Sequence, residues 1–220
     1  EKTKKPLIRP FYLQVGFKEA SLPYSYGGAK KEMDKGLTIP ARIKNTPIAQ
    51  GHFAGLQGAI HQIDAAIDII INGLKRSPYA KNTIIVFTAD CGINSGRDKD
   101  TLYDGGLEVP LIFHCPGLIP QGRSNALMSN MDIFPTLIDL VGGDTPLNIH
   151  AKNFADMIKG INVEEQRQYV MGVHEDSRYI RSKDYKLIAN FAQVQVASTP
   201  VDLAMPATSA APELEFYCLK

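Results

Sequence analysis

Residues 82–117 (NTIIVFTADCGINSGRDKDTLYDGGLEVPLIFHCPG) contain two apolar runs separated by a polar loop, which predicts two strands of a buried sheet. The strands are expected at residues 83–88 and 109–114. Three charged residues in the loop are candidates for binding chemistry: Asp90, Arg97 and Lys99. Chemistry in open α/β sheets collects at the carboxyl ends of strands, so this loop is the first candidate site. A solvated loop between two core strands is the alternative that spacing alone leaves open.

A period of 3.6 residues predicts a long amphipathic helix from about Ile48 to Arg76. One apolar stripe is expected to cover a face of the sheet, and it consists of Leu56, Ile60, Ile63, Ile67, Ile70 and Leu74. Before the helix, aromatic and β-branched residues alternate and predict a strand over residues 10–17. A helix between strands at this spacing is typical of a βαβ unit, so these strands should be parallel. His52 and His61 are expected to be structural.

The rest of the chain contains one predicted short helix, followed by a group of predicted strands. The run MDIFPTLIDLVG predicts a short helix that begins near Asp132 and Pro135, with an apolar face made of Ile133, Leu137, Ile138 and Val141. Beyond residue 161, the runs QYVMGVHE, RYIRS, DYKLIANF and LEFYCLK have no helices between them. They predict a small antiparallel β subdomain over residues 162–220, packed on an α/β part over residues 1–161.

The amino-acid composition argues against two classes of binding partner. With a net charge of +1, the chain lacks the electrostatic attraction that nucleic acid or an anionic membrane surface would exploit. No apolar run reaches membrane-spanning length. Cys91, Cys115 and Cys218 show neither CxxC nor zinc-site spacing, and an odd number leaves at least one free thiol. Cys115 follows an apolar strand and should be a small buried hydrophobic residue.

Several separate runs resemble the sulfatase family. NTIIVFTADCG with GRDKDTLYDGGLEVPLI resembles its strand, metal-binding turn and lysine loop, and PFYLQVGFKEASLPY is similar to the segment ending in Glu-Pro-His-x-Pro-Tyr. SNMDIFPTLIDLVG resembles its Asp-x-x-Pro-Thr helix, and RYIRSKDYKLIANF with ELEFYCL resembles its closing strands, in the branch of heparan N-sulfatase (sulfamidase). The resemblance implies an α/β fold: part of an alkaline-phosphatase-like three-layer α/β/α sandwich with a mostly parallel sheet, then a small carboxyl-terminal antiparallel β subdomain.

Family members also carry a Cys/Ser-x-Pro-x-Arg signature, whose first residue is oxidised to the formylglycine nucleophile. The chain contains no such run, and CPG at Cys115 lacks the arginine. The chain therefore resembles the carboxyl-terminal portion of a sulfatase, and by itself it is expected to be inactive. The family also suggests a periplasmic, secreted or lysosomal location.

The resemblance implies roles for individual residues. Asp90 matches a carboxylate that binds a divalent cation, usually Ca²⁺, and Lys99 matches the lysine that contacts the sulfate. Arg97 is a candidate to support the same anion, and His174 and Arg178 are candidates to face the substrate. Taken alone, each residue has a common structural explanation: a turn-capping aspartate, solvated cations or a strand histidine.

Two positions depart from the family pattern. Cys91 stands where the family has Asn or His beside the metal-binding aspartate, and a thiol is a soft ligand poorly suited to Ca²⁺. Ser21 stands where the family has the histidine that contacts the sulfate or the leaving group. Serine cannot supply a proton from a group that titrates near neutrality. Both departures weaken the prediction of turnover.

Three functions follow as hypotheses. The first is hydrolysis of sulfate esters or sulfamates, with a sulfated small molecule or glycan as substrate. The second is a non-catalytic sulfatase-like remnant that binds an anionic ligand or a partner chain. The third is a related phosphatase or phosphodiesterase, which the lack of Asp-His pairs near Asp90 disfavours. Because a partial sheet leaves an open edge and an exposed apolar face, the chain is also expected to dimerise or to pair with an amino-terminal half.

Overall fold

The computed structural model describes these residues of the 220-residue chain: 9–33, 36–95, 98–145, 148–161, 167–191 and, as a backbone strand, 213–218. The chain divides into two compact units, Glu1–Ile84 and Ile85–Lys220, and each is described by itself. Within the described ranges, no helix is both long enough and apolar enough to cross a membrane.

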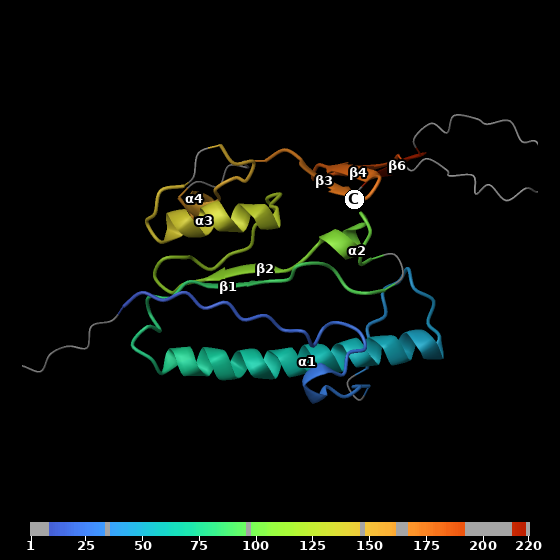
Figure 1. The fold of residues 1–220 in the computed structure, drawn as a ribbon, viewed down its shortest axis with the longest axis horizontal. Coiled ribbons are helices and arrows are strands. Elements are labelled where there is room, and N and C mark those ends of the chain that lie inside the picture. Colours follow the sequence, from blue (N-terminus) through green and yellow to red (C-terminus); the bar gives the residue numbers. More distant parts are fainter. Residues whose placement is uncertain are drawn as a thin grey trace, which may run out of the picture. The chain divides into compact units, whose positions relative to one another are not determined.

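The first unit is built on one long helix, α1 (Pro47–Lys75), which is labelled in Figure 1. The helix begins where the sequence predicts, because Thr46 caps it and Pro47 occupies its first position. The Thr46 hydroxyl accepts a hydrogen bond from the Ala49 amide at 3.2 Å, which satisfies one of the unpaired amides of the first turn. The predicted helix from Ile48 to Arg76 is confirmed.

The buried face of α1 differs from the predicted stripe. Its buried residues are Phe53, Ala54, Gly55, Leu56, Gly58 and Ala59, so only Leu56 of the predicted stripe is among them. Ile60 is 52% exposed. The cause is a close backbone approach, because a Cβ placed on Gly58 would lie 1.7 Å from the Lys30 carbonyl oxygen. The buried residues of α1 therefore lie in its amino-terminal half, and four of the six are glycine or alanine.

The two histidines on α1 are structural, as expected. His52 Nε2 lies 3.2 Å from the hydroxyl of buried Tyr24, and burial raises the pKa of that phenol. His61 Nδ1 lies 3.0 Å from Glu32 Oε2. Both contacts fasten the segment before the helix onto the helix surface.

The predicted strand over residues 10–17 is wrong. This stretch is extended but pairs with no strand in the described part of the chain, and the first regular element is a 3₁₀ turn, η1 (Tyr26–Gly28). Tyr12 is 81% exposed and Leu13 65% exposed. Apolar alternation alone does not make a strand, because a strand also needs a neighbour for its backbone hydrogen bonds.

The second unit begins with two short strands, β1 (Ile85–Thr88) and β2 (Leu111–His114). Both lie inside the predicted strands, but they pair in antiparallel register, with Ile85 opposite His114. The predicted parallel βαβ unit is a different one: it joins residues 10–17 to residues 83–88 through the long helix. That prediction is wrong because residues 10–17 form no strand in the described part of the chain. The chain reverses between β1 and β2 through a loop and one helical turn, α2 (Asp104–Leu107), rather than through the crossover that parallel strands need.

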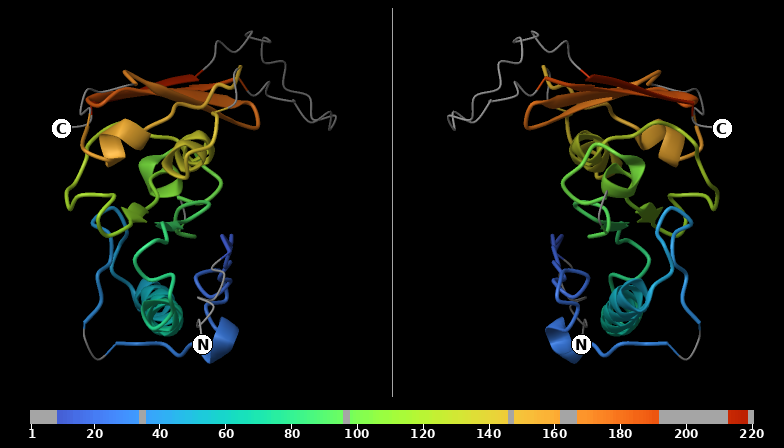
Figure 2. Two further views of the ribbon diagram at one scale, coloured as in Figure 1. Left: turned by 90° about the vertical axis from the view of Figure 1, so that its left-hand side faces the viewer. Right: turned by 90° about the vertical axis from the view of Figure 1, so that its right-hand side faces the viewer.

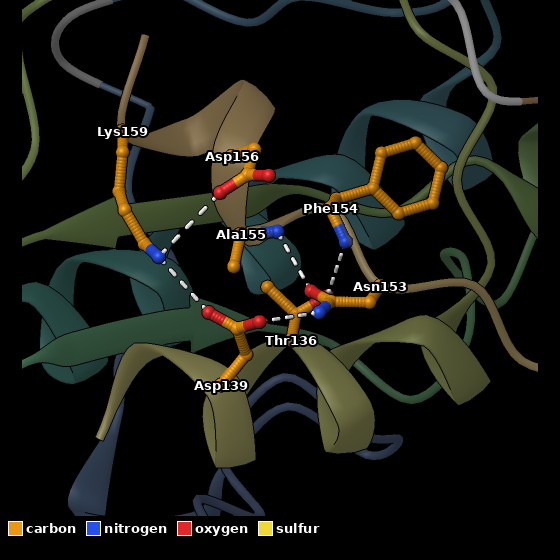
Figure 3. Close-up of polar contacts among 7 residues, drawn as sticks. All are labelled: Thr136, Asp139, Asn153, Phe154, Ala155, Asp156 and Lys159. Atoms are coloured by element: carbon orange, nitrogen blue, oxygen red, sulfur yellow. Dashed lines mark hydrogen bonds and ion pairs between the residues drawn. The ribbon is translucent and has the colours of Figure 1, made fainter. Parts of the chain in front are cut away.

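A helical pair follows β2. The 3₁₀ turn η2 (Asn130–Asp132) leads into α3 (Ile133–Leu140), which confirms the predicted short helix, and α4 (Ala155–Ile158) packs beside it. The buried face of α3 is Pro135, Thr136 and Leu140, whereas the predicted face member Val141 is 70% exposed. The Thr136 hydroxyl accepts a hydrogen bond from the Phe154 amide at 3.0 Å, so a polar contact occupies the centre of this interface (Figure 3).

The carboxyl-terminal strands form the predicted antiparallel sheet. Its strands are β3 (Val170–His174), β4 (Ser177–Arg181), β5 (Tyr185–Asn190) and β6 (Glu213–Cys218), hydrogen-bonded in that order. Figures 1 and 2 both show α2 against one face of this sheet. Residues of that face, including Lys186 and Ile188, are buried, whereas Met171 and Val173 on the opposite face are exposed. The predicted division of the chain near residue 162 stays a prediction.

Candidate functional site

The Asp90 turn follows β1 and is held by backbone contacts. The Gly92 amide donates to the Gly106 carbonyl oxygen at 2.9 Å, and Asn130 Nδ2 donates to the Ala89 carbonyl oxygen at 3.1 Å. Asp90 itself is exposed. The carboxylate therefore projects from a fixed backbone and is accessible to a ligand.

Cys91 and Asp90 interact directly. Burial raises the pKa of the Cys91 thiol, and the hydrogen bond to Asp90 with the negative charge of that carboxylate raises this pKa further. The positive charge of nearby Lys99 acts in the opposite direction. At neutral pH the thiol therefore stays protonated, and it donates to Asp90 instead of serving as a thiolate ligand.

The Lys99 loop is anchored beside the same turn. The Lys99 amide donates to the Ile93 carbonyl oxygen at 3.0 Å, and the Ser95 hydroxyl donates to the carboxylate of Asp98, a side chain that is only 1% exposed. Lys99 is exposed, like Asp90. The charges of Asp90 and Lys99 both act on the Cys91 thiol, so the three residues lie near one another. Arg97 lies outside the described residues.

The Asp90 turn and the Lys99 loop both contact the helical turn α2. The contacts that hold α2 itself in place are not predicted from the sequence. The α2 residue Asp104 accepts hydrogen bonds at Oδ1 from Lys186 Nζ at 2.8 Å and from an Arg181 guanidinium nitrogen at 3.1 Å. Asp104 belongs to the recognised TLYDGG run. Its partners lie 77 and 82 positions further along the chain, so no local pattern connects them.

The other candidate residues belong to other elements of the chain. Ser21 belongs to the first unit, where its carbonyl accepts from the Tyr24 amide at 2.8 Å. His174 on β3 pairs with Ser177, and Val173 pairs with Arg178, so the side chains of His174 and Arg178 lie on opposite faces of the sheet. The Arg178 guanidinium donates to the carbonyls of the β3–β4 turn at 2.7 and 2.9 Å. Only His174 shares the face that carries Lys186.

The fit to a divalent cation rests on Asp90. A calcium site needs six to eight oxygen ligands, and Asp90 offers one hard carboxylate beside a protonated thiol. Across the ranges that the structure describes, no group of three or more His, Cys, Asp or Glu side chains is placed to hold a metal ion. Within those ranges Asp90 is therefore a single candidate ligand, and the metal site stays a prediction.

The comparisons with solved structures define the class of protein. The chain is similar to a putative sulfatase from Bacteroides thetaiotaomicron, with a TM-score of 0.56 and 25% identity over 64% of this chain and 34% of that one. It is also similar to a protein solved in complex with its substrate D-glucosamine-2-N,6-O-disulfate, with a TM-score of 0.61 and 23% identity over 80% and 36% of the two chains. The fold is accordingly the alkaline-phosphatase-like α/β fold of sulfatases, followed by a small antiparallel sheet, as the sequence implies.

The family follows from two family models. The "Sulfatase" model matches residues 5–143, and the model "N-sulphoglucosamine sulphohydrolase, C-terminal" matches residues 95–204. Together they span the helix, the Asp90 and Lys99 loops and most of the closing sheet. The chain belongs to the sulfatase family.

Curated relatives agree with this assignment. An ulvan-active sulfatase of Formosa agariphila is 34% identical over 126 residues, which cover 52% of this chain and 24% of the relative. Human N-acetylglucosamine-6-sulfatase is 32% identical over 115 residues, which cover 47% of this chain and 21% of the relative. The chain thus matches less than a quarter of the length of each of these two relatives.

Proposed function

We propose that the protein hydrolyses sulfate esters or sulfamates on sulfated sugars, and that this chain supplies part of the site that holds the sulfate. One observation carries the proposal: in a member of the sulfatase family, the Asp90 turn and the Lys99 loop rest on the same helical turn. The matched relatives named above are sulfatases of ulvan and of N-acetylglucosamine, which supports a sugar substrate.

The residues of this chain have separable roles in the proposed site. Lys99 is an exposed ammonium on an anchored loop, and such a point charge stabilises the negative charge of a bound sulfate. Asp90 supplies one hard oxygen ligand to Ca²⁺, which when bound would neutralise sulfate charge. The Cys91 thiol donates a hydrogen bond to the Asp90 carboxylate.

A kinetic experiment tests the role of Lys99. The complete gene product would be assayed on an aryl sulfate and on sulfated glucosamines, as wild type, Lys99→Ala and the control Lys44→Ala. Loss of one preorganised charge at the sulfate should lower kcat about 10²- to 10³-fold. Lys44 is an exposed lysine of the first unit, and its removal should change kcat less than about twofold. A Lys99→Ala enzyme with wild-type kcat would contradict the assigned role.

A second candidate function is anion binding without turnover. It is favoured by the Asp90–Cys91 hydrogen bond, because a protonated thiol occupies the position of a family metal ligand. Calorimetry of the 220-residue chain with calcium distinguishes the two functions, with Cys91→Asn as the variant that restores a family ligand type. Calcium binding by the wild-type chain would count against an inactive metal site. Binding of inorganic sulfate without calcium, in a protein that hydrolyses no sulfate ester, would favour the non-catalytic function.

A further inference from the structure

Two cations share a single carboxylate oxygen between α2 and the carboxyl-terminal sheet. Asp104 Oδ1 lies 2.8 Å from Lys186 Nζ and 3.1 Å from an Arg181 guanidinium nitrogen. Lys186 is only 3% exposed, and its ammonium also lies 5.2 Å from the centre of the Tyr179 ring. The α2–sheet cluster, as we call Asp104, Tyr179, Arg181 and Lys186, thus holds two positive charges around one negative charge.

This arrangement is a costly way to gain stability. Burial lowers the pKa of Lys186, and the hydrogen bond that its ammonium donates to Asp104 opposes that shift. Within the described part of the chain, Arg181 Nε is buried without a hydrogen-bond partner. Replacing a buried ion pair by apolar residues is often neutral or stabilising, so such a pair is weak evidence for a role in stability and better evidence for a role in fixing geometry.

The sheet accommodates the cluster by a specific local packing. Tyr179 pairs with Gly172 across β3 and β4, and a Cβ on Gly172 would lie 2.2 Å from the Tyr179 ring. The ring therefore lies over the glycine on the same face of the sheet as Lys186, and it limits where the ammonium can go. The position of Lys186 Nζ is set by the ring and by Asp104 together.

The backbone of α2 also contacts both loops of the candidate site. A Cβ on Gly92 would lie 1.8 Å from the Gly105 carbonyl oxygen, and a Cβ on Gly106 would lie 2.0 Å from the Asp98 carbonyl oxygen. The Gly92 amide donates to Gly106 as well. Gly92 is two residues after Asp90, and Asp98 directly precedes Lys99, so a shift of α2 must displace both loops.

We propose that Lys186 and Arg181 are positioning residues that hold Asp90 and Lys99 in register through Asp104 and α2. In this arrangement the carboxyl-terminal sheet contributes to the sulfate site without touching the sulfate. The positioning role rests on the proposed function, because it serves the same two residues. It predicts that the two loops loosen when the cluster loses a cation.

Amide hydrogen exchange of the 220-residue chain tests the mechanical link independently of activity. Lys186→Met keeps the length and burial of the side chain but removes its charge, and it should lower protection of the Gly92 and Lys99 amides about tenfold or more. The matched control is Lys159→Met, which removes a lysine from the α3–α4 ion pair and should change both amides less than about twofold.

A second variant keeps the experiment decisive if Lys186→Met does not fold. Arg181→Gln removes the more exposed cation and should loosen the same two amides, by a smaller factor. Wild-type protection of Gly92 and Lys99 in every folded cluster variant would overturn the proposal. An equal loss of protection in Lys159→Met would also overturn it, because the effect would then be general destabilisation.

Kinetics of the complete protein supply a readout that global stability does not move. In Lys186→Met, kcat should fall about tenfold with KM changed less than about threefold, because misplaced groups lose contacts made in the transition state. Lys186→Arg, which keeps the charge, should recover part of kcat. If the wild-type complete protein hydrolyses no sulfate ester or sulfamate, the proposed function fails, whereas the exchange result still decides the coupling of the cluster to the loops.

Discussion

Lys159 Nζ lies 2.9 Å from Asp139 Oδ1, and this ion pair joins α4 to α3 (Figure 3). Asp139 also accepts a hydrogen bond from Asn153 Nδ2 at 2.7 Å, while Asp156 lies 3.6 Å from the same ammonium. Asn153 and Lys159 therefore both bind the Asp139 carboxylate, and Asp156 lies near the same ammonium. The Asp139–Lys159 ion pair should make the free energy of unfolding depend on pH.

The stabilisation that this ion pair provides should be lost both at low pH and at high pH. Hydrogen bonds from Lys159 and then Asn153 lower the pKa of Asp139 below its ordinary 3.8, so its contribution is present above pH 3.8 and is lost as the pH falls through the lowered pKa. The hydrogen bond to Asp139 raises the pKa of Lys159 above 10.5, so its contribution is present below that pH and is lost as the pH rises through the raised pKa.

Asp139→Asn should therefore lower the free energy of unfolding by about 1 kcal/mol at pH 7, the size expected for a partly exposed ion pair. The difference from wild type should shrink as the pH falls below 3.8. Urea unfolding at neutral and acidic pH measures both values, with Asp68→Asn on the surface of α1 as the control. A difference that stays constant down to the acid limit would contradict the assignment.

Two glycines of α1 should respond to alanine in opposite directions. Gly58→Ala should destabilise the first unit by about 3 kcal/mol, because its Cβ would lie 1.7 Å from the Lys30 carbonyl oxygen. Gly73→Ala, in the same helix with nothing within 4 Å of the added Cβ, should stabilise it by about 0.5–1 kcal/mol. Thermal unfolding followed by circular dichroism compares the two variants. Equal effects would show that Lys30 does not approach the helix this closely.

Cys91 should be a slow nucleophile at neutral pH. Its pKa is raised above the ordinary 9.0 by burial and by Asp90, so Asp90→Asn should accelerate its alkylation by iodoacetamide at pH 8. Peptide mass spectrometry resolves Cys91 from buried Cys115, whose reaction should be unchanged in the variant. Slower alkylation of Cys91 in Asp90→Asn would contradict the described contact.

Asp132 should be the most sensitive carboxylate of the second unit among those with described contacts. It is fully buried and accepts from the Ser129 and Lys152 amides, both at 2.7 Å, and from Arg167 at 2.6 Å. Asp132→Asn leaves the Arg167 charge without its partner and should cost about 3–5 kcal/mol in urea unfolding. Asp156→Asn changes a mostly exposed carboxylate of α4 and should cost less than about 1 kcal/mol. Similar costs would argue against the buried pair.

The sequence by itself determined the elements that local chemistry specifies. The period of 3.6 residues and the Thr46–Pro47 start predict α1, and the four apolar runs after residue 161 predict β3 to β6. The motifs around Asp90 and Lys99 indicate the family because they are contiguous runs. Each of these signals lies within about one element of chain, where the residue types alone favour one backbone conformation.

Only the tertiary structure decided which segments meet. The antiparallel pairing of β1 with β2, the glycine-lined face of α1 and the contact of Asp104 with Lys186 all join segments far apart in sequence. The dimer, the metal and the substrate stay predictions. A pattern of side chains reports how one segment prefers to fold, but hydrogen-bond partners and charge pairs are chosen by competition among all segments of the chain. For that reason the Asp90–Lys99 loop could be recognised from its sequence, whereas the α2–sheet cluster could not.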